Sequence, residues 1–231
     1  QSTKVLVLHK NGTIYFANNG RDFNEKDLIA ISRSGASEKK RGETIGYRGI
    51  GFKSISSISE DIIIYSSGTF FSFSKRLCAQ ILMMDPDNVP TIRVPLFVDN
   101  IPKTIQLTVE HLEKEGYSTV FILRNPHEEL FSEELDCVDE GYFLFLKHIK
   151  ECLFQKSESK KPNSAFIINR ESINNKCYVT VISNYEKKEW MLIKGEGATI
   201  AFLLDKGVII PCPDSEAVYH CYLPTLDKAM I

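Results

Sequence analysis

Residues Ile45-Gly-Tyr-Arg-Gly-Ile-Gly-Phe-Lys-Ser54 decide how this chain is interpreted. They space three glycines as G-x-x-G-x-G, and a hydrophobic, helix-compatible run from Phe52 to Ile58 overlaps their end. Glycine lacks a Cβ, so the backbone N–H groups of such a loop can approach an anion closely. A helix that begins directly after the loop would point the positive end of its dipole at the same anion. The pattern therefore predicts a phosphate-binding loop, although G-x-G sequences also occur in ordinary turns.

The segments around this loop strengthen the prediction. In chain order we expect two strands at 4–9 and 13–16, an Asn-Gly turn at 18–20 and a helix at 24–34. A polar run at 34–43, the glycine loop at 45–54, a helix at 52–58 and a strand at 61–65 follow. Much later, Gly116-Tyr-Ser-Thr119 is typical of a turn that enters a buried strand, with Thr119 at its mouth.

This succession resembles the GHKL (Bergerat-fold) ATP-binding superfamily, which includes gyrase B subunits, the ninety-kilodalton heat-shock chaperone, histidine kinases and MutL. Within it, the resemblance is to sacsin-type, chaperone-like modules. Asn18-Asn-Gly-Arg-Asp-Phe23 corresponds to the adenine box, residues 34–43 to the ATP lid and residues 45–54 to the phosphate box, G-x-x-G-x-G-[FY]-x-S. Thr119, within G-x-x-T-x-[VIF]-x-[LI], corresponds to the threonine that holds the adenine-bridging water.

The resemblance implies ATP and Mg²⁺ as cofactors. The implied nucleotide-binding residues are Asn18, Gly20, Gly46, Gly49, Ile50, Gly51, Phe52, Lys53 and Thr119. In the family, an E-x-x-x-N helix carries the glutamate that activates water and the asparagine that binds Mg²⁺, and we expect it upstream of Lys4. No catalytic residue and no metal ligand is therefore assigned within this chain.

Two residues depart from the family pattern and leave the function open. Asn18 replaces the adenine-binding aspartate, so the contact with the adenine amino group loses its charge-assisted part. Asp22 replaces the second glycine of the adenine box. One hypothesis is an ATPase whose binding and slow hydrolysis of ATP drive lid and domain closure in a larger protein or complex. The alternative is a non-hydrolysing nucleotide-sensing or scaffold domain for protein–protein interaction.

Simpler interpretations exist for the same residues. Asn-Gly is a strong hairpin signal, so Asn18-Asn19-Gly20 could be a plain turn. Thr119 alone would be an ordinary strand residue, and Lys53 in a first helical turn would more often face solvent. The ordered succession of motifs favours the nucleotide site.

Composition indicates a soluble, cytoplasmic globular protein. Of the 231 residues, 43% are hydrophobic and 25% charged, and the net charge of −2 does not indicate nucleic-acid binding. No apolar run approaches the roughly 20 residues that cross a bilayer. The six cysteines contain no C-x-x-C pair, which favours a reducing compartment. A zinc site at Cys212, His220 and Cys221 is improbable on spacing. Expected partners are ATP and a homo-oligomer or larger complex.

The predicted fold class is α+β, a two-layer sandwich with a mostly antiparallel sheet, followed by the start of a β-rich domain. We expect an ATP-binding domain at 1–155, without its first helix, and an incomplete β-rich segment at 163–231, divided by the Lys/Ser/Pro-rich residues 155–162. In the first part we predict strands at 69–73, 104–109 and 119–123, then one or two helices within 128–154. In the second part we predict strands at 165–169, 176–182, 189–193, 198–204 and 218–225.

Overall fold

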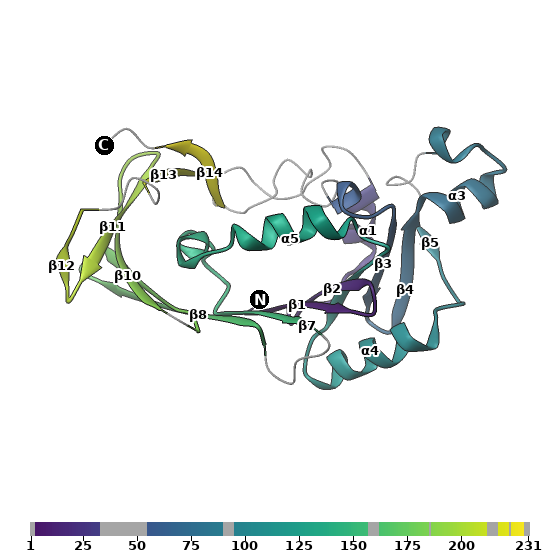
Figure 1. Cartoon of the computed structure of the whole chain (residues 1–231), viewed down its shortest axis with the longest axis horizontal. Helices are drawn as coiled ribbons and strands as arrows, with labels where there is room; N and C mark the ends of the chain where they lie inside the picture. Colours follow the sequence, from purple (N-terminus) through teal and green to yellow (C-terminus); the bar gives the residue numbers. More distant parts are fainter. Residues whose placement is uncertain are drawn as a thin grey trace.

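A mostly antiparallel sheet of 12 strands organises the described part of the chain, in the order β12-β11-β10-β9-β8-β7-β1-β2-β6-β3-β4-β5 (Figure 1). The computed structural model describes residues 3–32, 55–89, 95–156, 162–184, 186–211, 217–221 and 223–228. Strand β1 pairs with β2 antiparallel and with β7 in parallel. The α+β class and the mostly antiparallel sheet are confirmed.

The first half of the sheet is built from two hairpins and three further strands. Its strands are β1 (Lys4–Lys10), β2 (Thr13–Asn18), β3 (Asp61–Ser66), β4 (Thr69–Ser74), β5 (Leu96–Phe97), β6 (Thr119–Arg124) and β7 (Glu151–Lys156). Asn11 and Gly12, both at positive φ, form the two-residue turn between β1 and β2. Ser67 and Gly68, also at positive φ, form the two-residue turn between β3 and β4. The Asn-Gly hairpin turn is therefore at Asn11-Gly12. Residues 18–20 lead from β2 toward α1, so their interpretation as a hairpin turn is wrong.

Helices pack on both faces of this half, so the two-layer prediction needs correction. The described helices are α1 (Glu25–Ser32), α3 (Lys75–Leu82), α4 (Lys103–Lys114) and α5 (Glu128–Asp136), with short 3-10 turns η1 (Ile55–Ser57), η2 (Pro86–Asn88) and η4 (Glu140–Phe143). Helix α4 packs against alternate residues of the central strands such as Tyr15 and Ile63. Helix α5 packs through Phe131 on the other alternate set, which includes Val7 and Ile14. Figure 1 shows α5 and α4 on opposite sides of β1 and β2.

Two of the predicted elements have the wrong secondary structure. Residues 104–109 lie in helix α4 rather than in a strand, because Ile105, Val109 and Leu112 form one apolar helix face that is buried. Residues 151–154, predicted to close a helical segment, instead belong to strand β7, which pairs with both β1 and β8. The pairing of β7 with these distant strands explains why this segment is extended rather than helical.

The second half of the chain continues the same sheet. Its strands are β8 (Ser164–Ile173), β9 (Lys176–Ile182), β10 (Lys187–Lys194), β11 (Thr199–Asp205) and β12 (Val208–Ile209), while β13 (Val218–Cys221) and β14 (Leu223–Lys228) form a separate two-stranded sheet. The four strands predicted between 165 and 204 are confirmed. One buried cluster around Phe166 and Trp190 covers their inner face, and Val5 and Phe154 from the first half pack against it. The predicted division near 155–162 is thus no break in the sheet, and the division into two domains stays a prediction.

The turn η4 is tied to the second half by a half-buried arginine. The Arg170 guanidinium on β8 donates to the Ile149 carbonyl at 2.9 Å and to the Phe143 carbonyl at 2.6 Å. Its burial lowers the pKa of Arg170 from the ordinary value, yet arginine stays charged at neutral pH. These two bonds hold residues 143–149 against the buried cluster that contains Phe166 and Trp190.

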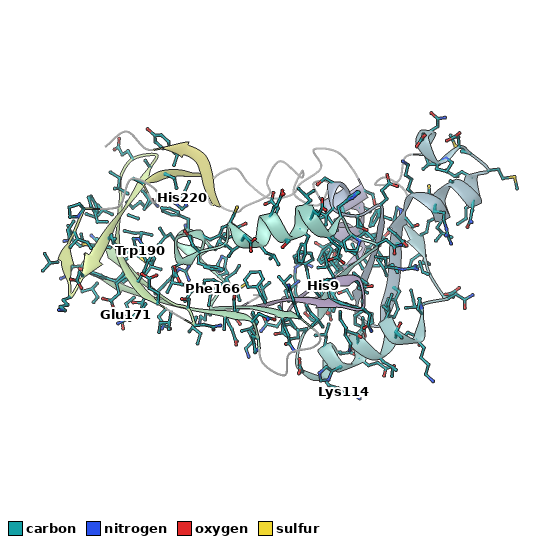
Figure 2. The ribbon with its side chains drawn as sticks, in the orientation of Figure 1. His9, Lys114, Phe166, Glu171, Trp190 and His220 are labelled. Carbon is teal, nitrogen blue, oxygen red and sulfur yellow. The ribbon has the colours of Figure 1, made fainter. Side chains whose placement is uncertain are left out.

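His220 makes the packing of β13 sensitive to pH. Its ring lies 4.9 Å from that of Phe145, and within the described residues its buried Nδ1 has no hydrogen-bond partner (Figure 2). Burial lowers the pKa of His220, and the charge of Asp139 opposes this shift. Since the folded pKa lies below the unfolded one, the unfolded chain takes up the proton first, and the stability that this residue contributes is lost as the pH falls below about 6.5.

We expect His220→Phe to reduce this acid destabilisation. The measurement is urea denaturation at a series of pH values from neutral to mildly acidic. The exposed His148 offers the matched control, because His148→Phe should leave the pH dependence as it is in the parent protein. An unchanged dependence in His220→Phe would contradict the assignment to His220.

Candidate functional site

Two predicted nucleotide-binding residues, far apart in the sequence, lie directly opposite each other. Asn18 is the last residue of β2 and Thr119 the first of β6, and the register of these strands pairs them. On the other side of β6, Thr119 is paired with Ser66, the last residue of β3. Three polar side chains therefore end three adjacent strands at one edge of the sheet.

These side chains face the layer that contains α1. In each strand they continue the alternate set of buried residues, for example Ile62 and Ile64 before Ser66. That set packs against Leu28 and Ile31 of α1 and against Ile55 of η1. The site thus lies at the edge of the sheet, on the face that α1 covers.

The Asn18 amide is held in one orientation. Its Oδ1 accepts a hydrogen bond from the Gly20 N–H at 3.0 Å, which leaves one lone pair of this oxygen for another donor. Ser118 ties the same turn to β6: its Oγ donates to the Gly20 carbonyl at 2.6 Å, and its N–H donates to the Asn18 carbonyl at 3.0 Å. Asn18 is half-buried, so its amide can be reached by a ligand.

Asn19 has a structural role that distinguishes it from Asn18. Its Oδ1 accepts from the N–H groups of Thr3 at 2.8 Å and Lys4 at 2.9 Å. Its Nδ2 donates to the Thr3 hydroxyl at 3.2 Å. Asn19 therefore holds the start of β1, and Asn18 alone of this pair is oriented beside Thr119.

Thr119 and Ser66 form a buried hydroxyl pair. Their oxygens are 3.0 Å apart, and the two residues are 1% and 3% exposed. The Ser66 Oγ also accepts from the Phe23 N–H at 3.0 Å. Ser66 is absent from the predicted site, because its place beside Thr119 depends on the pairing of β3 with β6, for which the sequence has no local signal.

The connection from Asn18 to α1 is ordered by its own polar residues. Asn24 and Asp27 cap the helix start reciprocally, with N–H to side-chain oxygen distances of 3.0 and 3.1 Å. The Arg21 guanidinium makes a two-pronged contact with the Asp27 carboxylate, with one distance of 2.6 Å. Asp22 does not have positive φ, so this position does not require the glycine of the family pattern.

Six of the predicted site residues, Gly46, Gly49, Ile50, Gly51, Phe52 and Lys53, lie outside the described residues. The elements that flank this segment are described: α1 ends at Ser32 and η1 begins at Ile55. Both pack on the sheet face toward which Asn18 and Thr119 point. The glycine-rich segment thus connects two elements that lie on the side of the candidate site, and its contacts with phosphate stay a prediction.

A cavity of about 240 Å³ lies elsewhere, between α5 and the strands β1, β7 and β8. It is lined by Val7, Phe131 and Phe166, with His9 bonded to Glu128 at 3.0 Å among its polar residues. The register places His9 beside Ile14, near the hairpin end of β2, whereas Asn18 is at the other end. This cavity is therefore separate from the candidate site.

Metal and membrane features are lacking in the described part of the chain. Within those ranges no three side chains of the His, Cys, Asp or Glu type gather closely enough to hold a metal ion. No helix there is both long and apolar enough to span a bilayer.

Comparison with known proteins finds distant similarity. No family model matches the chain. Protein NO VEIN of Arabidopsis thaliana is 25% identical over an alignment of 206 residues that covers 83% of this chain. The chain spans 7% of the length of that relative. Among solved structures, the N-terminal domain of a DNA repair protein matches with a TM-score of 0.37 and 10% identity, over 79% of this chain and 62% of that one. A likeness at this level supports no inference about the site.

Proposed function

We propose that this chain is the ATP-binding module of a chaperone-like GHKL ATPase of Bergerat type, which uses ATP binding and slow hydrolysis to drive lid and domain closure in a larger protein or complex. The observation that carries the proposal is the register that places Asn18 beside Thr119. The resemblance predicted this pair for the adenine from two separate motifs. A strand pairing has brought the two motifs together on the side where α1 and η1 flank the glycine-rich segment.

The described residues suit the adenine ring. The lone pair of Asn18 Oδ1 that Gly20 leaves available can accept from the exocyclic amino group of adenine. The Thr119 hydroxyl, deeply buried beside it, would act on the ring through one ordered water. Both groups are preorganised by neighbouring hydrogen bonds, so little conformational entropy is lost when the base binds.

The phosphates would be bound by the segment with Gly46, Gly49 and Gly51, through backbone N–H groups and with Lys53 as a nearby cation. Mg²⁺, when bound, would neutralise phosphate charge. The described residues contain no group of ligands for it. The resemblance assigns the Mg²⁺-binding asparagine and the general base to an E-x-x-x-N helix, and the residues named above bind and orient the nucleotide.

Calorimetric titration with ATP tests the proposal. We expect Asn18→Ala to weaken binding about tenfold, because a half-buried acceptor for the amino group is lost. Asn18→Asp should bind at least as tightly as the parent, since a carboxylate keeps both acceptor positions and adds charge. Gly51→Ala should also lose affinity, because a Cβ would crowd the phosphate loop.

The matched control is Asn169→Ala, which removes an exposed asparagine from β8. Its affinity for ATP should equal that of the parent protein. Unchanged affinity in both Asn18→Ala and Gly51→Ala would overturn the assignment of the site.

The second candidate function, a nucleotide-sensing or scaffold domain, is favoured by the replacement of the adenine-binding aspartate by Asn18. Steady-state phosphate release by the intact protein separates the two functions. Tight ATP binding without phosphate release would favour the sensor over the ATPase.

A further inference from the structure

The hydrogen atom of the Ser66 hydroxyl has one well-placed acceptor. A serine hydroxyl donates once and accepts up to twice. Ser66 Oγ accepts from the Phe23 N–H at 3.0 Å, so its own hydrogen must go elsewhere. The Thr119 Oγ1 is 3.0 Å away, whereas the Ser118 carbonyl is 3.5 Å away. A distance of 3.5 Å lies beyond the usual range for O–H···O bonds, so Ser66 donates to Thr119.

This direction determines what Thr119 offers to a ligand. Once Thr119 Oγ1 accepts from Ser66, its own hydrogen points away from Ser66. In the described part of the chain, Ser66 is the hydrogen-bond partner found for this hydroxyl. With 1% of Thr119 exposed, an unsatisfied hydroxyl here would be unfavourable, and a ligand or ordered water that accepts from it is favoured. Thr119 is therefore a donor toward the neighbouring site.

Resting on the proposed function, we propose that Ser66 is a positioning residue that fixes the Thr119 hydroxyl as a donor, so that the site selects purines with an unprotonated N1 over purines that carry a hydrogen on N1. Adenine has an acceptor at N1 and an amino group at position 6. Hypoxanthine and guanine have an N1–H donor and a carbonyl oxygen there. A water that accepts from Thr119 can direct one of its own hydrogens at an unprotonated N1. We expect this arrangement to be favoured over one in which the water accepts from both Thr119 and an N1–H.

Asn18 reinforces the same choice. Its Oδ1 is held toward the Gly20 N–H and presents an acceptor, which suits the 6-amino group. The chain of bonds from the Phe23 N–H through Ser66 to Thr119 supplies the matching donor. Without Ser66, the Thr119 hydroxyl could rotate and accept from N1–H, and the selection would weaken.

The test compares the dissociation constants of ATP and inosine triphosphate, which differ only at position 6 and at the N1 hydrogen. We expect the parent protein to prefer ATP by about tenfold or more, and Ser66→Ala to reduce this ratio about threefold to tenfold. Ser66→Thr keeps a hydroxyl and should retain the ratio. Thr119→Val removes the donor and should lower the ratio at least as far as Ser66→Ala does, with the remaining preference due to Asn18, so a test remains should Ser66→Ala fail to fold.

Ser72→Ala is the matched control. Ser72 is a buried serine of β4, 2% exposed, whose hydroxyl donates to the Ile62 carbonyl at 3.0 Å. Its loss should affect stability and leave the ratio unchanged. A ratio that persists in Ser66→Ala, or in Thr119→Val, overturns the role of Ser66. If the parent binds neither nucleotide, the proposed function fails as well, which is a different result from ATP binding with an unchanged ratio.

Discussion

Replacing Phe73 by alanine should lower the free energy of unfolding by about 3–5 kcal/mol. Phe73 lies on β4, is 1% exposed, and its ring meets Phe71 edge-on with 6.3 Å between centroids. It belongs to the buried cluster under α1 that also contains Ile62 and Ile64. Alanine would remove the transfer energy of the ring and leave a cavity that the flanking strands can fill only in part. Urea denaturation followed by circular dichroism measures the loss.

The control for Phe73 comes from the neighbouring strand. Phe97 on β5 is 74% exposed, so Phe97→Ala should change stability by less than about 0.5 kcal/mol. A comparable loss in both variants would contradict the arrangement of β4 and β5 in the sheet.

The single tryptophan of the chain adds a second measurement to this experiment. Trp190 is 5% exposed on β10, within the core of the second half, so its fluorescence reports the unfolding of β8–β12. Because β7 pairs with both β1 and β8, we expect Phe73→Ala to shift the Trp190 transition together with the dichroism transition. An unmoved Trp190 transition would instead indicate two independent domains, as the sequence predicted for 1–155 and 163–231.

The sequence predicted best where local signals are sufficient. Alternation and β-branched residues located the four strands between 165 and 204, and the small turn before Thr119 marked where β6 begins. The helix start near Asn24 could be predicted because amphipathic spacing and a capping residue coincide.

The pairing of strands that are distant in the sequence determined two features that local sequence patterns do not predict: the place of Ser66 and the conformation of β7. Ser66 joins the candidate site only through the pairing of β3 with β6, and β7 is a strand because two distant strands bond to it. The glycine-rich loop is a different case: it lies outside the described residues, so the most informative local motif stays a prediction.

Helix α4 shows how one segment can satisfy two periodicities. Residues Ile105, Leu107 and Val109 alternate as in a strand, while Ile105, Val109 and Leu112 follow the helical spacing. The structure resolves the choice through burial: Val109 is 2% exposed and Leu112 1%, whereas Leu107 is 54% exposed. The face that packs against the sheet is the helical one.

A pair of proline substitutions tests this assignment. Leu107→Pro should cost about 3 kcal/mol or more, because an interior helical proline removes one backbone hydrogen bond and clashes with the preceding turn. Lys103→Pro should be tolerated: Lys103 is exposed and begins α4, where the N–H has no intrahelical acceptor, and Pro102 before it already has an extended ψ of 134°. Urea denaturation of both variants gives the comparison. In a strand at 104–109 the contrast between the first helical position and the interior would be absent, so equal losses would contradict α4. A large difference would instead support α4 as the layer that covers the sheet opposite the candidate nucleotide site.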